Sequence, residues 1–332
     1  MNNFKKIGMT ALAASLVSTS VFAGEVTVAG GASINWENYS GVAKSSTKSF
    51  SMGNQLTFSG SGELDNGMTV GISFVLDQND DSTAASGAYS GGPFDSHSVS
   101  VSSDALGTLV FHGEGGDSAQ NAVGDTAAGN IWDNFDARVT GAATLSESQA
   151  GNNIMHYTLP SLVDDLTVAV SYTPAGANDE SSSAFGLTYA GVEGLSVSYG
   201  QGSADGDAAG SGGTAANSDT TSLKASYAIG SFTLAYSDHD HDSNTDTSDQ
   251  TATSWKVSYT VSDAVSVTYG TESLDSAATA DTSDAEYTKI TASHTSGGMT
   301  VSANYQEATE MSYTTATDED EEYYGLSLSF AF

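Results

Sequence analysis

The sequence predicts an all-β fold, a transmembrane antiparallel β-barrel of about sixteen strands with long outer loops and short periplasmic turns. Two observations predict it. Short segments alternate apolar and polar residues with period 2, and tight turns between them alternate with long polar loops. After residue 23 no run of 18 apolar residues could form a transmembrane helix. In such a barrel the apolar side chains of each strand meet lipid and the polar ones meet water.

The composition would not suit a conventional soluble domain. The 332 residues carry 38% hydrophobic residues and a formal net charge of −33, too little apolar material for a core of that size. A disordered acidic chain is disfavoured by 15 tyrosines and 12 phenylalanines, because disordered segments are poor in aromatics. The absence of cysteine excludes a disulfide framework and a thiolate metal site.

The first residues resemble a secretory signal peptide over residues 1–23. Lys5 and Lys6 precede an apolar stretch too short for a comfortable membrane span, and "VFA" provides small residues for cleavage before Gly24. An uncleaved anchor is the alternative. Cleavage would leave residues 24–332 as a single barrel domain with six basic against 41 acidic residues, a net charge of −35.

Turn signals divide the rest of the chain into hairpins. Asp65, Asn66 and Gly67 join two alternating segments, and dipeptides of this type are strong hairpin signals. Similar short connections recur at 191–194, 229–231, 261–264 and 295–298. The expected strands are 26–37, 54–64, 68–76, 98–103, 108–113, 153–159, 166–173, 184–190, 195–201, 223–228, 232–238, 254–260, 265–271, 287–294, 299–306 and 323–332.

The last strand shows why a bilayer is needed. Its residues Tyr324, Leu326, Leu328, Phe330 and Phe332 share one face, although the preceding segment is strongly acidic. Lipid would bury this face, and pairing with the first strand would leave no open edge.

These features together resemble the general porins of Gram-negative bacteria, particularly the alphaproteobacterial ones. The resemblance rests on the signal peptide, the strand pattern, the acidic bias and the terminal Phe332. It implies a water-filled channel in the outer membrane for passive diffusion of small hydrophilic solutes and ions, not an enzyme. It also implies homotrimers, a third loop folded into the pore, and Phe332 as the signal read by the barrel-assembly machinery. Lipid and lipopolysaccharide are further expected partners, and nucleic acid is not. The "PEFGG" motif of enterobacterial third loops is absent.

The segment from Glu114 to Ala150 occupies the position of that third loop, and its apolar residues Ile131, Trp132 and Phe135 could anchor it. An outward surface loop is the alternative. If the segment folds inward, we expect acidic groups at the constriction. They are Asp117, Asp125, Asp133, Asp136 and Glu147, against the single basic Arg138.

Three lysines lie opposite the apolar face of their strands and are expected to point into the lumen. They are Lys224, Lys256 and Lys289. Charges that line a channel tune its ion selectivity, so the lysines would set up a transverse field if an acidic loop lies opposite them. The simpler interpretation is that they point at water, the least costly place for a charge in a barrel.

The acidic stretch "DHDHDSNTDTSD" resembles a calcium loop in its spacing of oxygen donors. The donors are Asp238, Asp240, Asp242, Asp246 and Asp249. Ser243 replaces the usual glycine, and the final position is Asp rather than Glu, so a solvated acidic loop is the alternative to low-affinity divalent cation binding. Apart from such a cation, no cofactor is expected.

Three classes of function remain open. The favoured one is a passive channel that prefers cations, because its mouth and third loop are acidic. The second is an outer-membrane barrel enzyme of protease or phospholipase type that uses His239 and His241 with the neighbouring aspartates, although no Ser, His and acid group has a defined spacing. The third is a secreted acidic β-rich surface adhesin.

We expect deletion of Phe332 to lower the amount of heat-resistant trimer in outer membranes, because this residue closes the aromatic alternation and is the implied assembly signal. Gel electrophoresis of purified outer membranes, with and without heating, would measure the amount of trimer. Full trimer yield from the truncated chain would contradict the prediction.

Overall fold

The computed structural model describes residues 26–41, 48–77, 94–135, 152–174, 181–205, 218–243, 249–277, 283–311, 313 and 320–332. These residues form sixteen β-strands. They are β1 (Thr27–Gly41), β2 (Lys48–Glu63), β3 (Thr69–Asp77), β4 (Ser96–Ser103), β5 (Gly107–Glu114), β6 (Ile154–Thr158), β7 (Leu166–Thr173), β8 (Ser182–Val192), β9 (Leu195–Ala204), β10 (Ser218–Ile229), β11 (Phe232–Ser243), β12 (Gln250–Ser262), β13 (Val265–Ser276), β14 (Ala285–Ser296), β15 (Met299–Thr309) and β16 (Glu321–Ala331). The expected signal peptide lies outside the described residues and stays a prediction.

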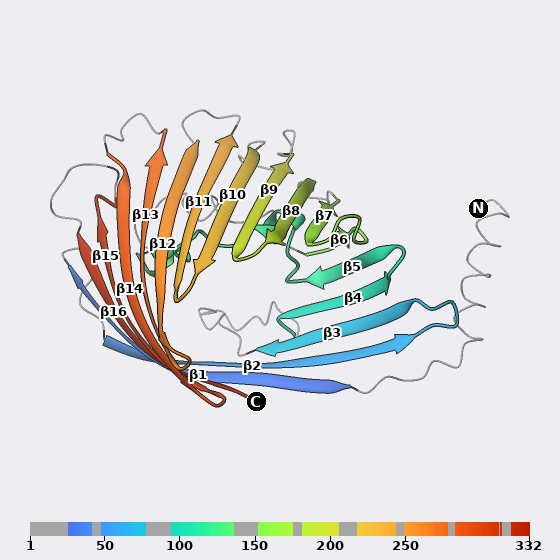
Figure 1. The fold of residues 1–332 in the computed structure, drawn as a ribbon, viewed down its shortest axis with the longest axis horizontal. Coiled ribbons are helices and arrows are strands. Elements are labelled where there is room, and N and C mark those ends of the chain that lie inside the picture. Colours follow the sequence, from blue (N-terminus) through green and yellow to red (C-terminus); the bar gives the residue numbers. More distant parts are fainter. Residues whose placement is uncertain are drawn as a thin grey trace, which may run out of the picture.

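The strands form one closed antiparallel barrel in which each strand pairs with its neighbours in sequence and β1 pairs with β16 (Figure 1). The closing register runs from Gly31 opposite Ala331 to Gly41 opposite Glu321. Beyond it, Phe332 exchanges backbone hydrogen bonds of 2.8 and 3.0 Å with Gly30. The barrel therefore has no open edge, as the sequence predicted.

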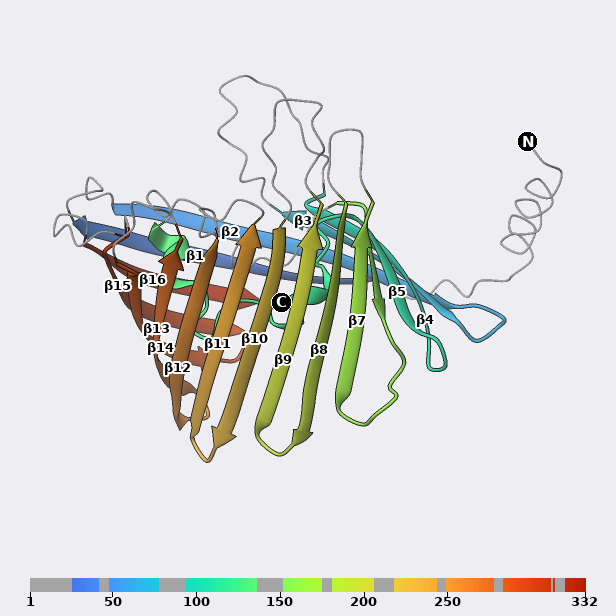
Figure 2. The ribbon, with the colours of Figure 1, turned by 90° about the horizontal axis from the view of Figure 1, so that it is seen from above.

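Short turns gather at one rim of the barrel (Figure 2). The turns between β10 and β11 and between β14 and β15 each begin at a glycine with positive φ, Gly230 at 58° and Gly297 at 60°. A residue without a Cβ adopts this conformation without steric cost. The start of β1 and the end of β16 lie at the same rim, so every long connection belongs to the opposite one.

The outer wall carries the apolar half of each alternation. Exposed apolar residues run around it, for example Phe50, Met52 and Leu234. A row of aromatic side chains borders this band on its long-loop side, and Trp255 lies 5.4 Å from Tyr269 and Tyr305 5.1 Å from Tyr324 between ring centroids. Such rows are typical of the membrane interface. None of the helices in the described part of the chain is long and apolar enough to cross a membrane.

Several strands extend beyond the ends that the sequence predicted. β11 continues to Ser243 rather than ending near Asp238, and β13 continues to Ser276. Their polar ends remain paired with neighbouring strands although they lie past the apolar band. The interpretation of 238–243 as part of a loop is corrected accordingly.

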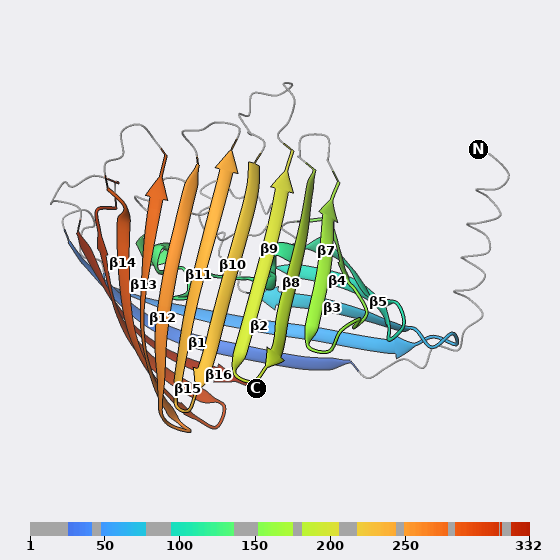
Figure 3. The ribbon, with the colours of Figure 1, turned by 45° about the horizontal axis from the view of Figure 1, so that its top comes forward.

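The connection between β5 and β6 turns inward. Its described part, residues 115–135, is called the inner loop here and contains two short 3₁₀ helices, η1 (Ala119–Ala122) and η2 (Ile131–Phe135). In Figure 3 this green segment passes behind the strands of the wall, and η1 contacts β7, β8 and β9 while η2 contacts β14 and β15. The loop therefore lies inside the barrel.

Candidate pore constriction

The backbone of the inner loop is hydrogen-bonded to side chains on the lumen face of the wall. Ser171 on β7 accepts the N–H of Ala119 at 2.8 Å. Ser237 on β11 accepts the N–H of Ala127 at 2.8 Å, and Ser254 on β12 accepts that of Ala128 at 2.9 Å. These are lumen positions of their strands, since they alternate with lipid-facing residues. The wall serines thus satisfy backbone donors that would otherwise be buried without a partner, at a cost of about 1–3 kcal/mol each.

Glu272 on β13 holds the centre of the loop. Its side chain is 1% exposed, and its two carboxylate oxygens accept hydrogen bonds from the hydroxyl of Thr126 and, at 2.5 Å, from the N–H of Ile131. Glu272 and the wall serines carry no local sequence signal that marks them as contacts of the loop. The predicted strands place the three serines on the lumen face, whereas Glu272 lies just beyond the predicted strand 265–271. Local alternation could not show that a loop 52 to 146 residues away in sequence would cover these four residues.

An apolar cluster fixes the end of the inner loop. Ile131, Trp132 and Phe135 are at most 1% exposed and pack with residues of β12–β15, including Leu274 and Tyr287. Burying side chains of this size contributes about 1.5–3 kcal/mol each. The three residues anchor the loop as the sequence suggested, and this part of the lumen is packed.

Glycines in the wall let the loop backbone approach closely. A Cβ at Gly186 on β8 would collide with the carbonyl oxygen of Ala119, and one at Gly200 on β9 would lie 2.7 Å from that of Gln120. On β13, a Cβ at Gly270 would lie 2.7 Å from the Cβ of Ala128. Glycine at these three wall positions therefore leaves the space that the backbone of the inner loop occupies.

The free edge of the inner loop is acidic. Asp117, Asp125 and Asp133 are all exposed, while the residues between them are largely turned toward the wall. Asn130 donates from its side-chain amide to the carboxylate of Asp125 at 3.2 Å. Asp136, Arg138 and Glu147, which the sequence also assigned to the constriction, lie outside the described residues.

The three lysines face the lumen but not from the position expected. Lys224 donates to the carbonyl oxygen of Asp125 at 2.8 Å, and Lys256 and Lys289 both pair in register with Gly270, one from each side. They therefore lie on the wall that carries the inner loop. The expectation that they would face the loop across the channel is corrected, because the loop folds back onto their own strands.

The part of the wall formed by β2, β3 and β4 is neutral along most of its lumen face. Its lumen positions carry mainly hydroxyl groups and glycines, among them Ser51, Gly53, Thr57, Ser73 and Ser100. Within the side chains that the structure describes, these three strands contribute no lysine or arginine to the lumen. No basic group of the described residues on these strands therefore opposes the acidic edge of the inner loop.

The acidic and histidine residues of β11 are separated by the wall itself. Asp238, Asp240 and Asp242 share the outer face with Tyr236, whereas His239 shares the lumen face with Ser237. His239 is fully buried, and its Nδ1 lies 2.9 Å from the hydroxyl of Ser222. Alternation thus prevents His239 and its neighbouring aspartates from forming a catalytic pair.

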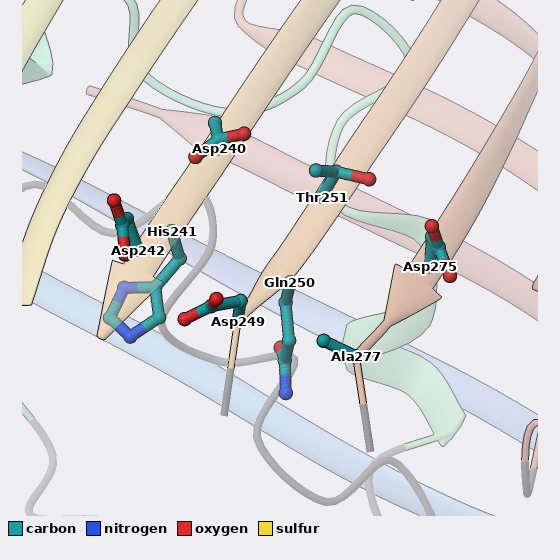
Figure 4. Close-up of a pocket in the computed structure, with 8 residues that line it drawn as sticks. All are labelled: Asp240, His241, Asp242, Asp249, Gln250, Thr251, Asp275 and Ala277. Carbon is teal, nitrogen blue, oxygen red and sulfur yellow. The ribbon is translucent and has the colours of Figure 1, made fainter. Parts of the chain in front are cut away.

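Near the rim a pocket lies where β11 and β13 end and β12 begins (Figure 4). Asp249 accepts the N–H of Ser243 there at 2.8 Å, and the side chains of Asp240 and Asp242 lie on β11 rather than on a loop. Among the described residues no group of three or more His, Asp or Glu side chains is arranged to hold a metal ion. Asp246 lies outside the described residues.

The chain is similar to known proteins in both sequence and fold. A model of the family described as Gram-negative porin matches residues 8–332. No curated protein sequence matches the chain. Among solved structures, an anion-selective porin from Comamonas acidovorans matches with a TM-score of 0.70 at 18% identity, over 93% of this chain and 100% of that one.

Two further solved structures are similar. OmpT from Vibrio cholerae, an outer membrane protein solved in a trimer form, matches with a TM-score of 0.66 at 15% identity. A mutant of the Rh. blastica porin matches with a TM-score of 0.64 at 15% identity. Both matches cover 93% of this chain and 100% of the other. At these identities the likeness shows the shared barrel fold.

We predict that Gly186→Ala displaces η1, because the added Cβ meets the carbonyl of Ala119, and that it destabilises the folded barrel by about 1–3 kcal/mol. Single-channel conductance should change, and the temperature at which the barrel unfolds should fall. Gly60→Ala is the matched control, since a Cβ there makes only ordinary contacts of 3.6 and 3.7 Å on the outer wall. Equal behaviour of the two variants would contradict the placement of the loop.

Proposed function

Because this chain belongs to the Gram-negative porin family and forms an outer-membrane β-barrel channel, we propose that it lets small hydrophilic solutes and ions diffuse passively, with a preference for cations. The family and the fold indicate a channel rather than an enzyme. The observation that carries the preference is the acidic free edge of the inner loop, with Asp117, Asp125 and Asp133 exposed in the lumen.

The lysines offset only part of this acidic edge, although Lys224 and Lys289 interact electrostatically with Asp125 and Lys289 also with Asp133. All three lysines are only partly exposed, because the inner loop lies against the strands that carry them. Lys224 donates a hydrogen bond to the backbone of that loop. The aspartates are exposed, and the wall formed by β2, β3 and β4 carries mainly hydroxyl groups and glycines on its lumen face. A permeating ion therefore approaches the carboxylates more closely than the ammonium groups, and the nearest charges dominate because screening acts over about 8 Å at physiological salt.

The proposal also includes assembly as a homotrimer, for which the family membership is the support. Terminal Phe332 remains the proposed signal for the barrel-assembly machinery. Its ring is 74% exposed on the outer wall while its backbone closes the barrel against Gly30, so a binding partner could reach the ring in the folded rim.

Lipopolysaccharide is proposed as a partner of the outer wall through divalent cations such as calcium. Beyond the aromatic row the outward positions turn acidic, with Asp238, Asp240, Glu286, Glu307 and Glu322. The described outer-wall side chains include no lysine or arginine that could bind phosphate groups directly. Carboxylates and phosphates can share a hard divalent cation through their oxygens.

We predict that the native channel prefers cations in a potassium chloride gradient and that the preference weakens as salt rises. Asp125→Asn with Asp133→Asn should lower the cation-to-anion permeability ratio about twofold to fivefold, since a unit charge at 4–8 Å in water is worth about 0.5–1 kcal/mol. Reversal potentials measure the ratio. Asp240→Asn with Asp242→Asn, which removes the same charge from the outer wall, should change it less. Anion preference of the native channel would refute the proposal.

We also predict that chelation of divalent cations lowers the amount of lipopolysaccharide that copurifies with the barrel. Glu307→Gln with Asp238→Asn should lower it in the presence of magnesium, because both carboxylates leave the outer wall. Asp263→Asn, in the short turn after β12, is the control of like chemistry at the other rim. An amount of copurifying lipopolysaccharide that chelation does not change would contradict the proposed binding through divalent cations.

A further inference from the structure

Glu272 contacts a turn that is closed on itself. The turn begins at Thr126, whose hydroxyl accepts the N–H groups of Gly129 at 3.1 Å and Asn130 at 3.0 Å while it donates to Glu272. The N–H of Thr126 in turn donates to the side-chain oxygen of Asn130 at 3.0 Å. With Ile131 also bound to Glu272, both ends of the turn meet the same buried carboxylate.

The turn presents one of the constriction aspartates. The side-chain amide of Asn130 donates to a carboxylate oxygen of Asp125 at 3.2 Å, and the backbone carbonyl of Asp125 accepts from Lys224 at 2.8 Å. Asn130 has φ of 47°, a conformation that an L-residue rarely adopts and that the surrounding bonds must hold. Asp125 is thus held to Glu272 through Thr126 and Asn130.

We propose that Glu272 is the positioning residue of the constriction: its buried carboxylate seats the Thr126 turn and thereby fixes the Asp125 carboxylate at the edge of the channel. This inference rests on the proposed role of the inner-loop aspartates in ion selectivity. Glu272 itself is 1% exposed, so a permeating ion does not contact it. Its effect on ions is transmitted by where it holds Asp125.

Two isosteric variants separate positioning from charge. In Glu272→Gln the amide has only one oxygen, so it can accept only one of the two hydrogen bonds that Thr126 and Ile131 donate. One negative charge is also lost. In Thr126→Val the hydroxyl is lost at nearly constant volume and no charge changes. If Glu272 acts by positioning, both variants should lower the cation-to-anion permeability ratio in the same direction, by about twofold, the scale of one displaced charge.

The decisive experiment is a double-mutant cycle on reversal potentials in planar bilayers. Each variant is measured alone and together with Asp125→Asn. We expect Glu272→Gln and Thr126→Val to have no further effect once Asp125 is neutral, because they act through its carboxylate. Asp263→Asn is the control. Asp263 lies in the short turn between β12 and β13, and its neutralisation should leave the permeability ratio unchanged.

Effects that add to that of Asp125→Asn would overturn the proposal, since Glu272 would then act through its own field or through another group. An unchanged ratio in Thr126→Val would overturn it as well, and this variant decides the matter if Glu272→Gln does not fold. The cycle compares changes and not the sign of selectivity. Anion preference of the native channel would therefore refute the proposed function and leave the test of Glu272 intact.

Discussion

The structure depends on the requirement that a loop buried inside a barrel must satisfy its backbone polar groups against the wall. Water cannot reach the covered side of the inner loop, so each N–H there needs an acceptor on a strand. Serines on β7, β11 and β12 and the carboxylate on β13 supply acceptors in the order in which the loop passes them. Glycines at Gly186, Gly200 and Gly270 give the loop room to come that close. The position of the acidic edge in the channel follows from this fit.

The same alternation that builds the wall assigns chemistry to its two sides. On β11 the aspartates face outward and the histidines inward, so residues adjacent in sequence are separated by the thickness of the sheet. Alternation therefore separates His239 from Asp238 and Asp240, its neighbours in sequence. The aspartates lie on the outer face of the barrel, and His239 is buried on the lumen face.

Much of the fold could be predicted from the sequence, because turn signals and period-2 alternation are local. The hairpin around Gly67 and the closure of the last strand on the first are examples. The ends of β11 and β13 could not, since residues such as Asp240 and Asp275 leave the apolar pattern while their backbones stay paired with neighbours. The site was predictable only in part. Trp132 could be recognised as an anchor from its place in a polar loop, whereas Glu272 and Ser237 look like ordinary lumen residues until the loop that covers them is in place.

The most direct test of the account is a disulfide between the inner loop and the wall. Ala127→Cys with Ser237→Cys places one thiol on the Cβ of residue 127, whose backbone N–H now donates to the Ser237 hydroxyl at 2.8 Å, and the other thiol in place of that hydroxyl. The chain has no other cysteine. The account predicts that oxidation joins them in folded barrels and that single-channel conductance before and after oxidation is the same, because the bond fixes a contact that already exists. Thiols that remain free in folded barrels, or a bond that forms only together with a change in conductance, would contradict it.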